Sequence, residues 1–121
     1  VSGIEGRLVQ VFQNLISNAR SFTPPGGKIS LSVRRDRGDV VVHVEDQGPG
    51  IPADSLDSIF ERFYSERPEG ESFGRHSGLG LSISRQIIEA HGGAIHAENI
   101  DGTGGRRLGA RFVVRLRAAR P

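Results

Sequence analysis

An apolar run at residues 40–44 ends in two acids and then enters the glycine-rich stretch Asp46-Gln47-Gly48-Pro49-Gly50. Residues two apart on a strand face the same side, so Asp46 continues the row of valines that points to the core. A carboxylate there is partly removed from water and needs hydrogen-bond donors. Gly48 and Gly50 carry no side chains and leave room for a ligand beside the backbone. The pattern favours a carboxylate that accepts a hydrogen bond from the amine of a flat, polar ligand. A turn that simply closes the strand is the alternative.

Two asparagines four residues apart, Asn14 and Asn18, share one face of a helical segment, and Gln10 extends that polar stripe. Amide oxygens suit a hard cation such as Mg²⁺, which keeps water and phosphate oxygens as its other ligands. Taken alone, the stripe is better explained as an ordinary solvated helix face than as a ligand site. Whether the stripe is a cation site therefore depends on whether the fold places phosphate-binding residues next to it.

A third candidate is the stretch HSGLGLSIS at residues 76–84, where glycines lead directly into an apolar helical pattern. Backbone N–H groups at a helix N-terminus, together with the helix dipole, favour phosphate. The stretch is not a P-loop, because the pattern G-x-x-x-x-G-K-[ST] is absent from the sequence. A pair of spaced glycines is a weak signal unless other motifs accompany it.

These three stretches must be positioned by a small set of helices and strands. Apolar residues recur at three- and four-residue steps over residues 4–20 and again over 80–91, which predicts two helices. Alternating patterns predict strands at 28–35, 40–46, 94–99 and 110–117, with a short helix at 53–63 and a long irregular stretch at 64–77. The mixture predicts an α/β protein in two layers, with helices on one face of the sheet and antiparallel neighbouring strands.

Composition restricts the possible functions. The chain has 121 residues, 36% of them hydrophobic and 25% charged, which is typical of one globular domain. It has no cysteine, so disulfides and thiolate metal sites are excluded, and no apolar run is long enough to span a membrane. The net charge is +2, and the arginines near the C-terminus are interpreted as a solvated strand face rather than a nucleic-acid surface.

Taken in order, the motifs resemble those of the catalytic ATP-binding domain of bacterial sensor histidine kinases, which belongs to the GHKL superfamily. NLISNARSFT is similar to the asparagine box, DQGPGIP to the first glycine box, IFERFY to the phenylalanine box, and SGLGLSIS to the second glycine box. The segments IIEAHGG and GARFVVRL resemble the helix and the last strand that follow. The resemblance implies the Bergerat fold, an α/β (α+β) two-layer sandwich with a mixed sheet covered on one face by helices. It implies a single catalytic domain over residues 1–121, with its N-terminal strand truncated and the dimerisation domain absent.

The resemblance also implies residue roles. Asp46 would accept the adenine amino group, Asn14 would act at the phosphates, and Asn18 would bind Mg²⁺. Residues 64–77 would form a mobile lid. The remaining residues that it places around the nucleotide are Phe22, Gly48, Gly50, Ile51, Phe60, Phe63, Ser77, Gly78, Leu79, Gly80 and Leu81.

Some positions depart from the family pattern. Ser21 and Ser65 stand where the family often carries a cation, so Arg62, Arg67 or Arg75 would supply the positive charge at the γ-phosphate. Hydrolytic members of the superfamily place a glutamate where this chain has Asn14. An amide is a poor base, which favours transfer to a protein over hydrolysis.

The function implied by the resemblance is binding of ATP and Mg²⁺ and transfer of the γ-phosphoryl group to a histidine on a separate dimerisation domain. The implied partners are that phosphoacceptor domain and a response regulator, with no nucleic acid. The domain would be cytoplasmic, part of a sensor anchored in the inner membrane by other segments. RSFT and the stretch from SERPEG to EAHGG look like the acid- and host-responsive sensors of alphaproteobacteria. The alternatives are an anti-sigma-factor type of serine kinase and a non-catalytic nucleotide-binding regulatory module.

Overall fold

A computed structural model of the chain describes residues 5–61, 80–102, 104 and 107–117. Within these ranges the elements are two helices, four strands and two short 3₁₀ turns. In chain order they are α1 (Glu5–Phe22), β1 (Ser30–Asp36), β2 (Asp39–Glu45), η1 (Ala53–Ser55), η2 (Ser58–Phe60), α2 (Gly80–Ala90), β3 (Ala94–Asp101) and β4 (Arg107–Arg117). None of the helices described is long and apolar enough to cross a membrane.

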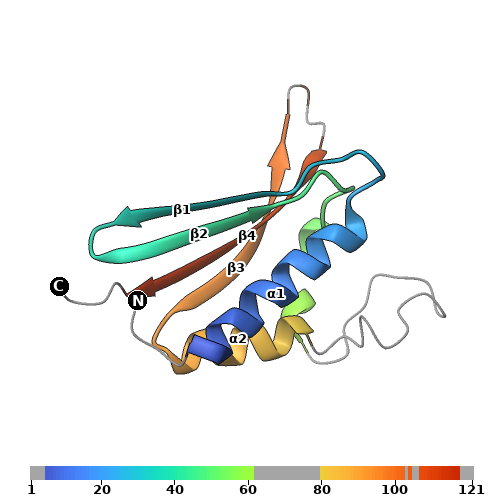
Figure 1. The fold of residues 1–121 in the computed structure, drawn as a ribbon. Coiled ribbons are helices and arrows are strands. Elements are labelled where there is room, and N and C mark those ends of the chain that lie inside the picture. The colour runs from blue at the N-terminus through green and yellow to red at the C-terminus, as the bar shows by residue number, and fades with distance from the viewer. Residues whose placement is uncertain (1–4, 62–79, 103, 105–106, 118–121) are drawn as a thin grey trace.

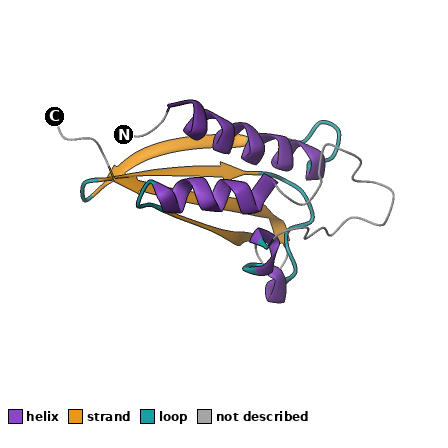
Figure 2. Ribbon diagram, turned by 90° about the horizontal axis from the view of Figure 1, so that it is seen from below, coloured by secondary structure: helices purple, strands orange, loops and turns teal. Residues whose placement is uncertain are grey.

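The four strands form one sheet in the order β1-β2-β4-β3, and both helices lie on the same face of it (Figures 1 and 2). The predicted two-layer α/β architecture is therefore confirmed. All three pairings are antiparallel, which differs from the mixed sheet that the resemblance implies. Within the described strands, β1–β2 and β3–β4 pair as sequential antiparallel neighbours, and the two pairs join through antiparallel β2 and β4.

The core lies between the sheet and the two helices. On α1 the predicted helical periodicity is confirmed, because Val11, Leu15 and Ala19 are completely buried at four-residue steps. The sheet contributes the alternate residues of its central strands, and α2 contributes two isoleucines. These buried partners are Val42, Val44, Phe112, Val114, Ile87 and Ile88. The core holds the end of β2 and the start of α2 in fixed positions, where two of the candidate motifs lie.

The edge strand β1 is less covered than its pattern suggests. Leu31 and Val33 pair with Val44 and Val42, so they lie on the helix-covered side of the sheet, as their alternation predicts. They nevertheless remain 55% and 63% exposed. Helix α1 packs over the neighbouring strand β2, and β1 lies beyond it. Alternation therefore identified the correct face, although it did not predict burial.

The single helix predicted at residues 53–63 is wrong. This part of the chain forms η1 and η2, each closed by backbone hydrogen bonds between residues three apart, such as Ser55 to Pro52 and Phe60 to Asp57. Glu61 is extended (φ −76°, ψ 152°), so the helical conformation ends there. The two tight turns bury Ile59 and Phe60 in the core.

The helix-free face of the sheet carries the predicted solvated arginines. Arg111 on β4 forms ion pairs of 2.7 Å with both Glu45 on β2 and Glu98 on β3. These ion pairs join three strands and hold the pKa of Glu98 below its usual value. Arg115 forms a similar pair of contacts with Asp36 and Asp39. For these two arginines, the interpretation as an ordinary charged strand face is confirmed.

Candidate functional site

The first candidate, Asp46, follows the last residue of β2 and is only 4% exposed. Its Oδ1 atom accepts hydrogen bonds from the backbone N–H groups of Gly48 (2.8 Å) and Ala110 (3.3 Å). Its own N–H donates to the Ala110 carbonyl (2.9 Å), which extends the pairing with β4. The other carboxylate oxygen, Oδ2, accepts no hydrogen bond from the described part of the chain. Asp46 is therefore the buried, core-facing acid predicted from the sequence, and one of its oxygens is available to a ligand.

The electrostatic setting of Asp46 also favours a ligand. Burial raises the pKa of the Asp46 carboxyl above its usual range, and the N–H groups of Gly48 and Ala110 oppose that rise. Desolvation disfavours the ionised form, and two donors compensate for it only in part. A further N–H donated to Oδ2 would stabilise the carboxylate. A ligand with an exocyclic amine supplies such a donor.

The loop after Asp46 is held by a residue that sequence reasoning missed. Gly48 is buried, and Gly50 has a φ of +84°, a conformation that disfavours any residue with a Cβ. At the end of the loop, the side chain of Asn99 on β3 binds both backbone polar groups of Ile51. The only sequence signal for this contact was a polar residue in the core-facing row of Ile95 and Ala97.

Strand β4 approaches the Asp46 backbone very closely at Gly109. A Cβ atom at this position would overlap the carbonyl oxygen of Asp46 and would lie 3.1 Å from Cα of Gln47. Glycine is thus required here by the contact between two backbones. The same approach brings the Ala110 N–H within reach of the Asp46 carboxylate.

The asparagine helix and the second glycine motif meet in the structure. The Asn14 side-chain amide donates to the Gly80 carbonyl and to Ser84 Oγ, both at 3.3 Å, and the Ser84 hydroxyl donates to the same carbonyl at 2.8 Å. Gly80 begins α2, and a Cβ there would lie 3.9 Å from Asn14 Cγ. Two motifs 66 residues apart are therefore in direct contact.

Asn18 lies one turn further along α1 on the same face and is half-buried. Its side chain has no hydrogen bond to the described residues, so its amide oxygen is available as a hard ligand. The neighbouring Ser21 hydroxyl donates to the Asn18 backbone carbonyl (2.8 Å). The end of α1, the start of α2 and the end of β2 lie at the same end of the molecule (Figure 1).

Two other predicted residues belong mainly to the core. Phe60 is 4% exposed and makes an edge-to-face contact with Phe112, with ring centroids 6.0 Å apart and an interplanar angle of 86°. The Arg85 guanidinium lies 5.6 Å from the Phe60 ring centroid. Leu81 is partly buried against the same core. Both residues therefore pack in or against the core, and their predicted contact with a nucleotide stays a prediction.

The remaining predicted site residues lie outside the part of the chain that the structure describes. Phe22 ends α1, but its side chain is not described. The predicted lid at 64–77 falls in the same category, as do Arg62, Phe63, Arg67, Arg75, Ser77, Gly78 and Leu79.

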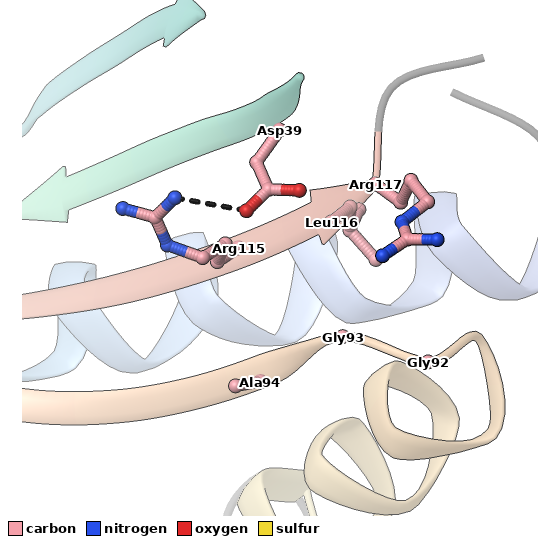
Figure 3. A pocket seen from close by; sticks show the side chains of 7 residues that line it. All are labelled: Asp39, Gly92, Gly93, Ala94, Arg115, Leu116 and Arg117. Carbon is pink, nitrogen blue, oxygen red and sulfur yellow. Dashed lines mark hydrogen bonds and ion pairs between the residues drawn. The ribbon is translucent and has the colours of Figure 1, made fainter. Parts of the chain in front are cut away.

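A small pocket of about 200 Å³ lies at the opposite end of β2 from Asp46 (Figure 3). The Arg115–Asp39 ion pair, Arg117 and the turn between α2 and β3 line it. Its one acid is already paired with Arg115, and neither the Asp46 loop, the asparagine stripe of α1 nor the start of α2 contributes to it. It is therefore separate from the candidate site.

Comparison with known proteins agrees with this geometry. A model of the family described as histidine kinase-, DNA gyrase B-, and HSP90-like ATPase matches residues 3–120. Sensor protein ChvG of Rhizobium meliloti is 60% identical over 119 residues, which are 98% of this chain and 21% of ChvG. The chain thus spans about a fifth of that relative's length. This relative agrees with the alphaproteobacterial part of the predicted resemblance.

The chain is also similar to solved structures of histidine kinases. The mycobacterial sensor histidine kinase MprB has a TM-score of 0.82 at 32% identity, over 95% of this chain and 72% of that one. Full-length ShkA in complex with AMPPNP has a TM-score of 0.76 at 32% identity, over 97% of this chain and 23% of that one. From the matched family model and these likenesses together, the chain belongs to the histidine kinase-, DNA gyrase B- and HSP90-like ATPase family.

Proposed function

We propose that this chain is the catalytic ATP-binding domain of a sensor histidine kinase. It binds ATP with Mg²⁺ and donates the γ-phosphoryl group to a histidine on the dimerisation domain. The observation that carries the proposal is the arrangement at one end of the fold. There a buried carboxylate with one open oxygen lies at the same end as the contact between Asn14 and the first turn of α2. The family membership and the AMPPNP complex of the similar ShkA protein support a nucleotide as the ligand.

Each part of this site suits one part of the nucleotide. Asp46 Oδ2 accepts the adenine amine, and Gly48 and Gly50 allow the flat base to lie against the backbone. The N-terminus of α2 favours phosphate because its N–H groups and dipole present positive potential. Asn18 fits Mg²⁺, because its free amide oxygen is a hard donor next to the expected phosphates. When bound, Mg²⁺ neutralises charge on the phosphate oxygens.

The chemistry at Asn14 favours transfer over hydrolysis. A base that activates water needs a lone pair of adequate basicity, and a side-chain amide has none. In this structure the Asn14 amide group already donates to Gly80 and Ser84. Phosphoryl transfer relies mainly on positioning and charge neutralisation. In that transfer the bond from Pγ to the ADP oxygen breaks, an N–Pγ bond to imidazole forms, and ADP leaves.

The partners and cellular setting are part of the same proposal. The phosphoacceptor histidine belongs to a dimerisation domain, and a response regulator receives the phosphoryl group from it. By the family resemblance, Arg62, Arg67 or Arg75 would supply the positive charge at the γ-phosphate, and residues 64–77 would form the lid. The domain works in the cytoplasm as part of a membrane-anchored sensor. The similarity to a sensor protein of which this chain spans about a fifth supports this setting.

A phosphoryl-transfer assay tests the proposed function. We expect that labelled ATP leaves the chain itself unlabelled but labels a dimerisation–histidine segment added to it. The label should be acid-labile, as a phosphoramidate is, and should be lost when the acceptor histidine is replaced by glutamine. Label on a partner serine instead would identify an anti-sigma type of serine kinase. ATP binding with no transfer at all would identify a non-catalytic regulatory module.

A further inference from the structure

We propose that Asn99 is a positioning residue for base recognition, which holds the loop after Asp46 in the conformation that reads adenine. The inference rests on the proposed nucleotide site and adds to it a residue from β3, a strand that none of the sequence motifs included. Asn99 does not itself need to touch the nucleotide. It acts through the backbone of Ile51.

The Asn99 side chain binds both the N–H and the carbonyl of Ile51. Asn99 Oδ1 accepts the Ile51 N–H at 2.7 Å, and Asn99 Nδ2 donates to the Ile51 carbonyl at 2.7 Å. A primary amide carries the same donor and acceptor pair as a peptide group. The Asn99 side chain therefore makes the two hydrogen bonds to the Ile51 backbone that a neighbouring strand would otherwise make. The amide orientation follows from the partners, because the reverse orientation would oppose N–H to N–H and oxygen to oxygen.

The position of Asn99 links it to Asp46 through the sheet. In the register between β3 and β4, Asn99 lies opposite Ala110. The Ala110 N–H donates to the Asp46 side-chain oxygen Oδ1, and the Ala110 carbonyl accepts the Asp46 N–H. The two ends of the loop, at Asp46 and at Ile51, are therefore fixed to adjacent positions of the same pair of strands.

The loop needs such an attachment. Two glycines lie between its ends, and glycine makes a chain more flexible. Ile51 is only 7% exposed, so its backbone N–H and carbonyl would lack compensation without Asn99. Release of Ile51 would let the loop move relative to the Asp46 carboxylate. Base recognition depends on the position of the loop relative to the Asp46 carboxylate, because a flat base must contact both the loop and Oδ2.

The test compares the affinities of ATP and ITP by calorimetry, because ITP carries an oxygen in place of the 6-amino group. We expect wild-type chain to prefer ATP. In the variants Asn99→Ala and Asn99→Asp, the ratio of ATP affinity to ITP affinity should be at least fivefold smaller than in wild type. Asn99→Asp keeps the acceptor for the Ile51 N–H but sets an oxygen against the Ile51 carbonyl. The matched control is Glu98→Gln, which removes an ion pair with Arg111 on the opposite face of the same strand. It should keep the preference.

Several outcomes would overturn the inference. An unchanged ATP-to-ITP ratio in folded Asn99 variants would reduce Asn99 to a stabilising residue. A ratio that falls equally in Glu98→Gln would have the same meaning. A measurement on the wild-type chain alone is independent of variant folding. The Ile51 amide should exchange its hydrogen slowly, because it donates to Asn99 Oδ1. Fast exchange would contradict this contact, the Asn99–Ile51 clamp. Failure of the wild-type chain to bind ATP would instead contradict the proposed function.

Discussion

Replacing Asp46 with asparagine is expected to weaken ATP binding at least tenfold, about 1.4 kcal/mol, without making the protein less stable. The N–H groups of Gly48 and Ala110 both point at Oδ1. In the variant they hold the amide oxygen in that place and direct the NH₂ group to where Oδ2 stood. A donor then faces the adenine amine, which is also a donor. Titration calorimetry with ATP measures the loss.

The stability of the same variant follows from the raised pKa of Asp46. A carboxyl whose pKa is higher in the folded state contributes stability below its unfolded pKa of about 3.9. That contribution is lost as the pH rises through the folded pKa. Near neutral pH the ionised Asp46 therefore costs stability, and asparagine removes that cost. We expect Asp46→Asn to melt at the same temperature as wild type or higher at pH 7, with any advantage fading towards pH 4.

A matched control is the acid at the other end of β2. Asp39→Asn also replaces an acid of similar chemistry, but Asp39 pairs with Arg115 at the far end of β2. It should leave ATP affinity unchanged. If Asp46→Asn bound ATP as tightly as wild type does, Asp46 would have no place in the nucleotide site.

Gly109→Ala is expected to lower the free energy of unfolding by roughly 3 kcal/mol and to abolish measurable ATP binding. The added Cβ would overlap the Asp46 carbonyl oxygen, and it would lie 2.8 Å from the carbonyl carbon. Backbone atoms cannot rotate out of the way as a side chain can. Strand β4 must therefore move away from Asp46, which breaks the hydrogen bonds through Ala110. Urea unfolding and ATP titration measure the two effects.

The control for this variant is the same substitution where space is open. A Cβ at Gly6, on the first turns of α1, meets nothing within 4 Å. Gly6→Ala should stabilise the protein by up to about 1 kcal/mol, because alanine is a better helix former than glycine. Equal stabilities of Gly109→Ala and wild type would show that β4 does not press against Asp46 as described.

Much of the positioning of the site could be predicted from local patterns. The four-residue repeat of Val11, Leu15 and Ala19 identified the buried face of α1. Alternation along β2 predicts that Asp46 faces the core, and its 4% exposure agrees. Such periodicity is reliable because each helix or strand must bury one face.

Other features depended on contacts that no local pattern encodes. The Asn99–Ile51 clamp joins residues 48 apart, and Asn14 meets Gly80 across 66 residues. Leu31 and Val33 had the right alternation for burial, but whether a helix covers a strand is decided by tertiary packing. At residues 53–63 the sequence predicted one helix, whereas the structure has two tight turns, the second of which buries Ile59 and Phe60.

A crystal structure with a non-hydrolysable ATP analogue and Mg²⁺ tests the nucleotide site itself. We predict that the adenine amino nitrogen lies within hydrogen-bond distance, about 3 Å, of Asp46 Oδ2. The phosphates should lie at the start of α2, with Asn18 Oδ1 bound to the metal. A nucleotide bound elsewhere, for instance in the pocket between Asp39 and Arg117, would contradict the site described here.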